Sequence, residues 1–245
     1  MTADSINFTS GLQGVLQLPR GKTVAWHPQQ PIQNLGDPRI FGTVFQDAPL
    51  FHPELVEYIC RKAATVPRNK RAVGGRKVRD AETWNLPGMQ LITWRVLQFY
   101  RQALNLSDAY VVDRWANVMV DRDYSTPHSH YDTESAVLYI LDPGDEDLEE
   151  PMDGNFEIID SRIPLCCPYQ PERPIRGISP KLVPGMMIVF PAEYLHHVRP
   201  YSGRRPRITM AWNVNPGPMP PDFQYDATKQ LEFKTDVMKG VPKMN

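Results

Sequence analysis

The sequence predicts a mainly β protein, either a barrel or a two-sheet jelly roll, braced by helices near its N-terminus. Two features carry this prediction. After residue 108, short runs of β-branched and aromatic residues alternate with turn signals such as Asp142–Asp145. Proline accounts for 25 of the 245 residues, about twice its usual share, which disfavours a helical bundle and favours short elements joined by turns.

The N-terminal part is predicted to hold two helices. Residues 39–45 read as an edge strand, and residues 52–60 carry apolar side chains at helical spacing. Residues 73–87 are charged and contain a glycine pair and a proline, so we expect a loop there. Residues 89–106 show the clearest apolar stripe of the chain and predict the second helix.

Strands are predicted in the second half of the chain, at residues 110–120, 136–141, 155–160, 186–190 and 208–214. Because the helices need a sheet to cover, we interpret residues 1–245 as a single domain. Residues 1–107 would form a helical and irregular part that packs on the sheet. Residues 108–216 would form the β core, and residues 217–245 a polar C-terminal arm.

Charge and composition disfavour several classes of function. The net charge is −1, so no global positive field is available to hold a nucleic acid. We find no run of about 18 apolar residues that could span a membrane, and no signal peptide at the N-terminus. The chain has three cysteines, two of them adjacent, which predicts a reduced protein of the cytoplasm. No particular oligomeric state is predicted.

Four of the six histidines lie in two clusters within the β-rich half. On an extended strand, residues i and i+2 share a face, so His130 and Asp132 would point into the barrel together. A histidine of the second cluster, His196 or His197, would complete the group. Two imidazoles and one carboxylate bind one face of an octahedral metal and leave three positions open, which suits Fe(II) and activation of O2.

Two alternatives stay open in this pattern. His128 has the same i, i+2 relation to His130, so a set of three histidines would resemble a cupin-type site. In the second cluster, His196 and His197 are neighbours on a predicted strand and face opposite ways. Local alternation of apolar and polar residues does not decide which of the two points inward.

Arg207 begins the last predicted strand, and the Ser202-Gly203 turn would bring it back beside the strand of His196. A guanidinium is a permanently charged fork that binds a carboxylate in bidentate fashion, which suits the distal carboxylate of a dicarboxylic keto acid. Thr209 lies two residues further on the same face and would donate a second hydrogen bond. The neighbouring Arg204 and Arg205 are interpreted as a solvated turn.

Several motifs resemble a bacterial and phage branch of the Fe(II)/2-oxoglutarate-dependent oxygenase superfamily. They span about residues 110–215 and lie at residues 115–117, 124–130, 135–139, 154–162, 184–185 and 190–191. In that branch the ligand histidine follows the Phe-Pro pair six residues after the Phe, which corresponds to His196. The sequence departs from the branch at Asp132, where Asn or a small residue is frequent, and at Ser161, where Pro is usual.

The resemblance implies a double-stranded β-helix that holds Fe(II) with His130, Asp132 and His196. It also implies that 2-oxoglutarate chelates the iron and pairs its C5 carboxylate with Arg207. Further roles are expected for residues on the predicted strands and loops. Asn117 and Tyr139 would contact the cosubstrate together with Thr209, whereas His128, Tyr124 and Arg162 would face the substrate.

The implied activity is oxidation of a small-molecule or amino-acid-like substrate, most simply hydroxylation. O2 and 2-oxoglutarate would be consumed, with release of succinate and CO2. An aspartate at position 132 argues against a halogenase, because those members of the superfamily carry a small residue there. Two other functions compete with this reading: a cupin-like metalloenzyme that does not use 2-oxoglutarate, and a non-catalytic jelly-roll binding module.

Overall fold

The computed structural model describes residues 15–27, 29–36, 39–68, 75–81, 84–145, 150, 152–159, 178–221 and 223. Its helices are α1 (His52–Thr65) and α2 (Pro87–Ala103), with a short 3-10 helix η1 (Ala48–Leu50) before α1. Both predicted helices are confirmed. The first runs further than residues 52–60, and the second begins at Pro87, whose missing N–H suits the first turn of a helix.

The strands form a large sheet, a small sheet and an N-terminal hairpin. The large sheet has the order β3 (Gln33–Asn34), β4 (Phe41–Val44), β10 (Met186–Pro191), β8 (Ser135–Asp142), β12 (Arg207–Pro216), β6 (Ala109–Met119) and β5 (Arg76–Val78). The small sheet has the order β7 (Asp123–His128), β11 (His196–Tyr201) and β9 (Phe156–Ile158). The hairpin pairs β1 (Val15–Leu18) with β2 (Gly21–Val24).

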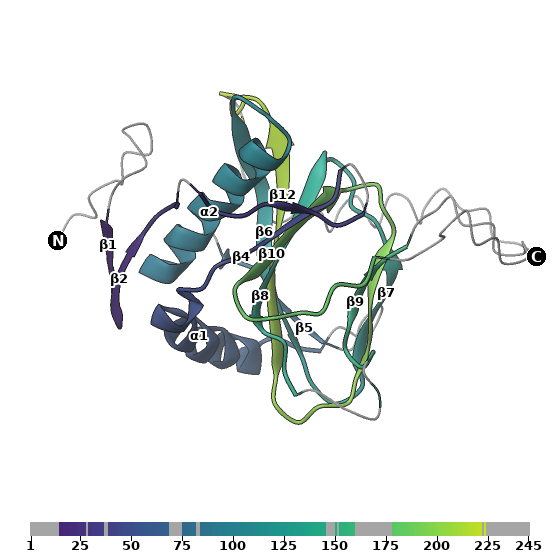
Figure 1. The fold of residues 1–245 in the computed structure, drawn as a ribbon. Coiled ribbons are helices and arrows are strands. Elements are labelled where there is room, and N and C mark those ends of the chain that lie inside the picture. Colours follow the sequence, from purple (N-terminus) through teal and green to yellow (C-terminus); the bar gives the residue numbers. More distant parts are fainter. Residues whose placement is uncertain are drawn as a thin grey trace, which may run out of the picture.

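Successive strands of the β core alternate between the two sheets. β6, β8, β10 and β12 lie in the large sheet, whereas β7, β9 and β11 lie in the small one, and neighbouring strands within each sheet are antiparallel. This alternation is the winding of a double-stranded β-helix. Figure 1 shows α1 and α2 on one side of the large sheet and the small sheet on the other. The predicted fold class is therefore confirmed.

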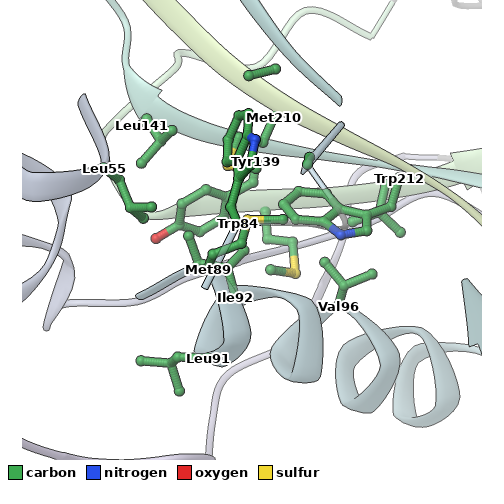
Figure 2. Close-up of a cluster of buried hydrophobic side chains, with 14 of the residues drawn as sticks. Leu55, Trp84, Met89, Leu91, Ile92, Val96, Tyr139, Leu141, Met210 and Trp212 are labelled. Carbon is green, nitrogen blue, oxygen red and sulfur yellow. The ribbon is translucent and has the colours of Figure 1, made fainter. Parts of the chain in front are cut away.

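The main hydrophobic core fills the space between the helices and the large sheet. Met210 and Trp212 of β12 pack there with Tyr139 of β8 and with Ile92 and Val96 of α2, all nearly inaccessible to solvent (Figure 2). Removing such side chains from water stabilises the fold by roughly 1.5–3 kcal/mol each. This core anchors the helices on one face of the sheet and leaves the other face for the space between the sheets.

A second apolar cluster joins the two sheets. Leu138 and Ile140 of β8 and Ile188 of β10 pack against Phe156 and Ile158 of β9. On the same face of the large sheet, β6 and β12 also contribute buried polar side chains. They include Thr209 and Asn213, which are 2% and 4% exposed. These polar side chains mark the half of the inter-sheet space that holds the candidate functional site.

The structure differs from the sequence prediction at the margins of the large sheet. Residues 73–87, expected to form a loop, contain β5, which pairs with β6. The strand predicted within residues 39–45 forms as β4, but it lies between β3 and β10 rather than at the sheet edge. Within the part of the chain that the structure describes, neither α1 nor α2 could span a lipid bilayer.

Candidate metal centre and cosubstrate pocket

Three histidines converge between the two sheets. His128 ends β7, His130 follows two residues later, and His196 begins β11. One possible ligand atom from each ring lies within 4.8 Å of those of the other two. The ring centroids of His128 and His196 are 4.3 Å apart, and those of His130 and His196 are 5.0 Å apart. This spacing fits three ligands of one divalent ion.

Each of the three rings is oriented by a hydrogen bond from Nδ1 to an oxygen that can only accept. The acceptors are the backbone carbonyl of Thr126 for His128 at 2.8 Å, Oδ1 of Asn213 for His130 at 2.7 Å, and the carbonyl of Tyr194 for His196 at 2.9 Å. Nδ1 therefore carries the hydrogen in each ring, and Nε2 keeps its lone pair. This is the tautomer in which histidine binds metals through Nε2.

Burial favours the neutral form of the two inner histidines. It lowers the pKa of His130 to about 4 and the pKa of His196 to about 3, and in both cases the neighbouring His128 lowers the pKa further. Both rings are therefore neutral imidazoles, and not imidazolium cations, at neutral pH. A metal ion entering the site does not have to displace protons from them.

Arg207 lies at the start of β12 with only 1% of its surface exposed. Among the described residues, its Nε and Nη2 have no hydrogen-bond partner, and its Nη1 contacts only the sulfur of Met119, at 3.8 Å. Burial lowers the pKa of Arg207 to about 10, so the guanidinium is still charged at neutral pH. A buried cation without a counter-charge is costly, which is expected where a ligand supplies the carboxylate.

β12 connects the guanidinium to the histidine cluster. Arg207, Thr209 and Asn213 share the inner face of this strand, because side chains alternate along it. Between them, Ile208, Met210 and Trp212 point the other way and pack in the main hydrophobic core. Thr209 pairs with Asn117 of β6, so these two polar side chains lie between the two ends of the site. The donor set fits both groups that the resemblance implies, a divalent iron at the imidazoles and a dicarboxylate that reaches Arg207.

The aromatic and basic residues beside His130 extend the site toward β5. The Trp115 ring lies 5.6 Å from the His130 ring, centroid to centroid, and Nζ of Lys77 lies 3.6 Å from the centroid of Trp115. The charge of Lys77 also contributes to the low pKa of His130. Trp115, which the sequence analysis did not assign to the site, therefore lines it.

The structure decides between the two adjacent histidines of β11. His196 is 5% exposed and points into the cluster, whereas Nε2 of His197 lies 3.2 Å from the carboxylate of Glu157 on β9. Successive side chains of a strand point to opposite faces, so these two neighbouring histidines do not both enter the cluster. The sequence alone left this choice open, and the family resemblance pointed to His196.

Asp132 and Tyr139, also predicted for the site, lie outside the histidine cluster. Asp132 is solvent-exposed and its carboxylate does not join the histidine group. Tyr139 faces the helices, where its hydroxyl hydrogen bonds to Nε2 of His52 at 2.8 Å, so it is on the opposite face of the large sheet from the histidines. Tyr124 of β7 is 44% exposed. Arg162 lies outside the described residues.

Asn213 was not identified from the sequence, although a signal for it existed. Continuing the alternation of β12 from Arg207 through Thr209 places Asn213 on the same face. The alternation does not predict the hydrogen-bond partner of Asn213, because His130 comes from a segment 83 residues away in sequence.

Comparison with known proteins agrees with this site. Residues 113–213, from β6 to β12, match a family described as "Putative 2OG-Fe(II) oxygenase". The β core thus carries the sequence pattern of the 2OG-Fe(II) oxygenases on a double-stranded β-helix, and the resemblance predicted from the sequence is confirmed. No curated protein matches the sequence at a significant level.

Solved structures share the fold at low sequence identity. A prolyl-4-hydroxylase from Pseudomonas putida is 16% identical, with a TM-score of 0.51 over 73% of this chain and 93% of that one. AviO1 from Streptomyces viridochromogenes Tue57 is 12% identical, with a TM-score of 0.54 over 75% and 92%. The epimerase SnoN, solved with Fe3+, α-ketoglutarate and nogalamycin RO, is 12% identical, with a TM-score of 0.52 over 79% and 82%.

Proposed function

We propose that this chain is a 2OG-Fe(II) oxygenase that hydroxylates a small-molecule or amino-acid-like substrate and releases succinate and CO2. The observation that carries the proposal is the pairing of two features on β12. Asn213 contacts the ring of His130 in the histidine cluster, and six residues earlier the buried guanidinium of Arg207 lacks a partner among the described residues. A chelating keto acid with a distal carboxylate would satisfy both ends.

His130 and His196 would hold the iron, and the third protein ligand comes from His128 or Asp132. Arg207 would bind the C5 carboxylate of 2-oxoglutarate, with Thr209 donating a second hydrogen bond. Bound Fe(II) and 2-oxoglutarate would supply the electrons that activate O2 for oxidation of the substrate. The protein's part is to position these groups and to keep water away from them.

The site has one apolar side and one solvent-exposed side. Phe190 and Phe156 lie 4.8 and 5.8 Å from the His196 ring, centroid to centroid, and form a dry apolar side. On the other side, His128 and Tyr124 are exposed to solvent. We assign the substrate to this open side, where Tyr124 would contact it, together with His128 if Asp132 supplies the third metal ligand. Asn117 is retained as a cosubstrate contact because it pairs with Thr209.

The experiment that tests the proposal measures succinate formation and 2-oxoglutarate binding. The protein is incubated with Fe(II), ascorbate, O2, 2-oxoglutarate and a panel of amino acids and small metabolites. Substrate-stimulated succinate formation supports the proposal. Oxygen uptake that is independent of 2-oxoglutarate would point to a cupin-like enzyme. Fe(II) binding without turnover and without 2-oxoglutarate affinity would point to a binding module.

We also propose that the chain works as one domain, because β3, β4 and β5 of the N-terminal part are strands of the large sheet. A cytoplasmic location is proposed from the cysteine content, and Cys60 is unbridged. A reducing compartment would also help keep the iron in its divalent state.

A further inference from the structure

We propose that the third protein ligand of the iron is His128, so that the metal centre consists of three imidazoles and no carboxylate. This inference rests on the proposed function and specifies its metal site. It departs from the set of two histidines and one carboxylate that the sequence pattern suggested.

The pairing of β7 and β11 brings His128 to the centre. His128 lies directly opposite His196 in this antiparallel pair, and side chains of directly opposed residues lie on the same face. Their ring centroids are the nearest pair in the cluster, at 4.3 Å, and the His128 ring stacks on His130 at 5.6 Å. The hydrogen bond from Nδ1 of His128 to the carbonyl of Thr126 leaves Nε2 as the ligand atom.

The chain turns away from the centre before it reaches Asp132. β7 ends at His128, so the i, i+2 rule of an extended strand no longer applies four residues later. Asp132 has a φ of 60°, in the left-handed region, which redirects the backbone and its side chain. Its carboxylate is exposed and lies outside the group of ligand atoms.

Hydrogen bonds on both sides of Asp132 hold this turn in place. On one side, the backbone N–H of His130 donates to the carbonyl of Ala192 at 2.8 Å. On the other side, the hydroxyl of Thr133 donates to the carbonyl of Val214 at 3.0 Å, and the N–H of Glu134 donates to Oδ1 of Asn215 at 2.7 Å. Bringing the Asp132 carboxylate to the metal would require these contacts to rearrange, whereas His128 is already in place.

An all-imidazole centre has a consequence for binding. Three neutral ligands leave the double charge of the ion uncompensated by the protein, so the cosubstrate carboxylate is the first anionic ligand it meets. Metal and 2-oxoglutarate should therefore bind with positive coupling, each tightening the other by the same factor.

The test compares Co(II) binding by His128→Ala and Asp132→Ala, using calorimetry on the full chain with and without 2-oxoglutarate. We expect Asp132→Ala to keep the dissociation constant within about twofold and His128→Ala to weaken it by at least about tenfold, as expected for losing a group that binds or orients a metal. The reverse pattern, equal losses in both variants, or no loss in either would each overturn the inference.

A second measurement does not depend on how well a variant folds. Electron spin echo modulation of the Cu(II)-loaded wild-type chain counts bound imidazoles, and three are expected where a carboxylate-containing site would show two. A different set of binding results is expected if the proposed function itself is wrong. In that case His130→Ala and His196→Ala would also retain Co(II) affinity, and 2-oxoglutarate would bind to no form of the protein.

Discussion

Oδ1 of Asn213 accepts a hydrogen bond from Nδ1 of His130 at 2.7 Å, and this contact links the last strand of the large sheet to the histidine cluster. Both side chains are largely buried. The amide oxygen fixes which nitrogen of His130 carries the hydrogen and which way the ring faces. β12 therefore orients a metal ligand at one position and presents Arg207 from the same face six residues earlier.

The first prediction concerns this contact. Asn213→Leu should weaken Co(II) binding by about 10–100-fold, because His130 would lose the partner that holds its ring and tautomer. Asn213→Asp should keep the affinity, since a carboxylate accepts the same hydrogen bond. Calorimetry on the purified full chain measures both effects.

Asn215→Ala is the matched control for the Asn213 variants. Asn215 lies on the same strand and accepts from the backbone N–H of Glu134, but it does not contact the His130 ring. Its variant should bind Co(II) within about threefold of wild type. If Asn215→Ala weakens binding as much as Asn213→Leu, the effect is a general loosening of the turn and not ring orientation.

The second prediction is that Arg207 opposes folding of the ligand-free protein while serving ligand binding. Arg207→Met should weaken 2-oxoglutarate binding by at least about 100-fold, because a charge-assisted bidentate contact is lost. The same variant should raise the free energy of unfolding of the ligand-free protein by about 1–3 kcal/mol, because an uncompensated buried cation is removed. Urea unfolding and calorimetry measure the two quantities.

Arg204→Met provides the control, since Arg204 lies in the exposed turn before β12. It should change neither quantity beyond about 0.5 kcal/mol. A variant of Arg207 that binds 2-oxoglutarate as well as wild type would remove the guanidinium from the cosubstrate pocket.

The sequence allowed much of this fold to be predicted because the strands of the β core have strong local patterns. The strand predicted at 110–120 is observed at Ala109–Met119, and that at 208–214 at Arg207–Pro216. β5 was missed because a three-residue strand gains its order from pairing with β6 and not from its own pattern. Alternation also placed Arg207 and Thr209 on one face.

Tyr139 and Asp132 were predicted for the site but lie outside the histidine cluster, and in both cases the position depends on tertiary packing that the local sequence pattern does not reveal. β8 is buried on both faces, between the helices on one side and the small sheet on the other, so its continuous apolar run does not reveal which residues face inward. Tyr139 therefore could not be assigned to a face. The position of Asp132 depends on where β7 ends, and that is set by tertiary contacts such as the hydrogen bond between Thr133 and Val214.

The third prediction concerns the pH dependence of stability through His52. Burial lowers the pKa of His52 from 6.5 to about 4, and its neutral ring hydrogen bonds to the hydroxyl of Tyr139. As the pH falls below 6.5, the unfolded chain takes up this proton before the folded protein does. The free energy of unfolding should then decline between pH 6.5 and 4, by up to about 3 kcal/mol from this residue.

His52→Gln should remove that part of the decline, because glutamine can still accept from Tyr139 but does not titrate. Urea unfolding of the metal-free protein at pH 7.5 and pH 4.5 gives the difference. His27→Gln, at an exposed histidine, should leave the decline unchanged. Equal acid sensitivity of wild type and His52→Gln would show that His52 is not protonated on unfolding in this range.

The fourth prediction tests how the end of β11 is held. Tyr201 is fully buried, and its hydroxyl accepts from the N–H of Asp145 and donates to the carbonyl of Arg205. Gly144 has a φ of +87°, and a Cβ there would lie 2.2 Å from the Tyr201 hydroxyl oxygen. Gly144→Ala should therefore combine backbone strain with a clash. We expect it to lower the free energy of unfolding by about 2–4 kcal/mol.

Gly36→Ala separates these two contributions. Gly36 has a similar φ of +98°, but nothing lies within 4 Å of a Cβ built there, so only the backbone strain of about 1–2 kcal/mol applies. The excess cost of Gly144→Ala over Gly36→Ala measures the contact with Tyr201. If the two variants unfold at the same urea concentration, the ring of Tyr201 can move away. In that case the hydrogen bonds of its hydroxyl do not fix the end of the strand that His196 begins.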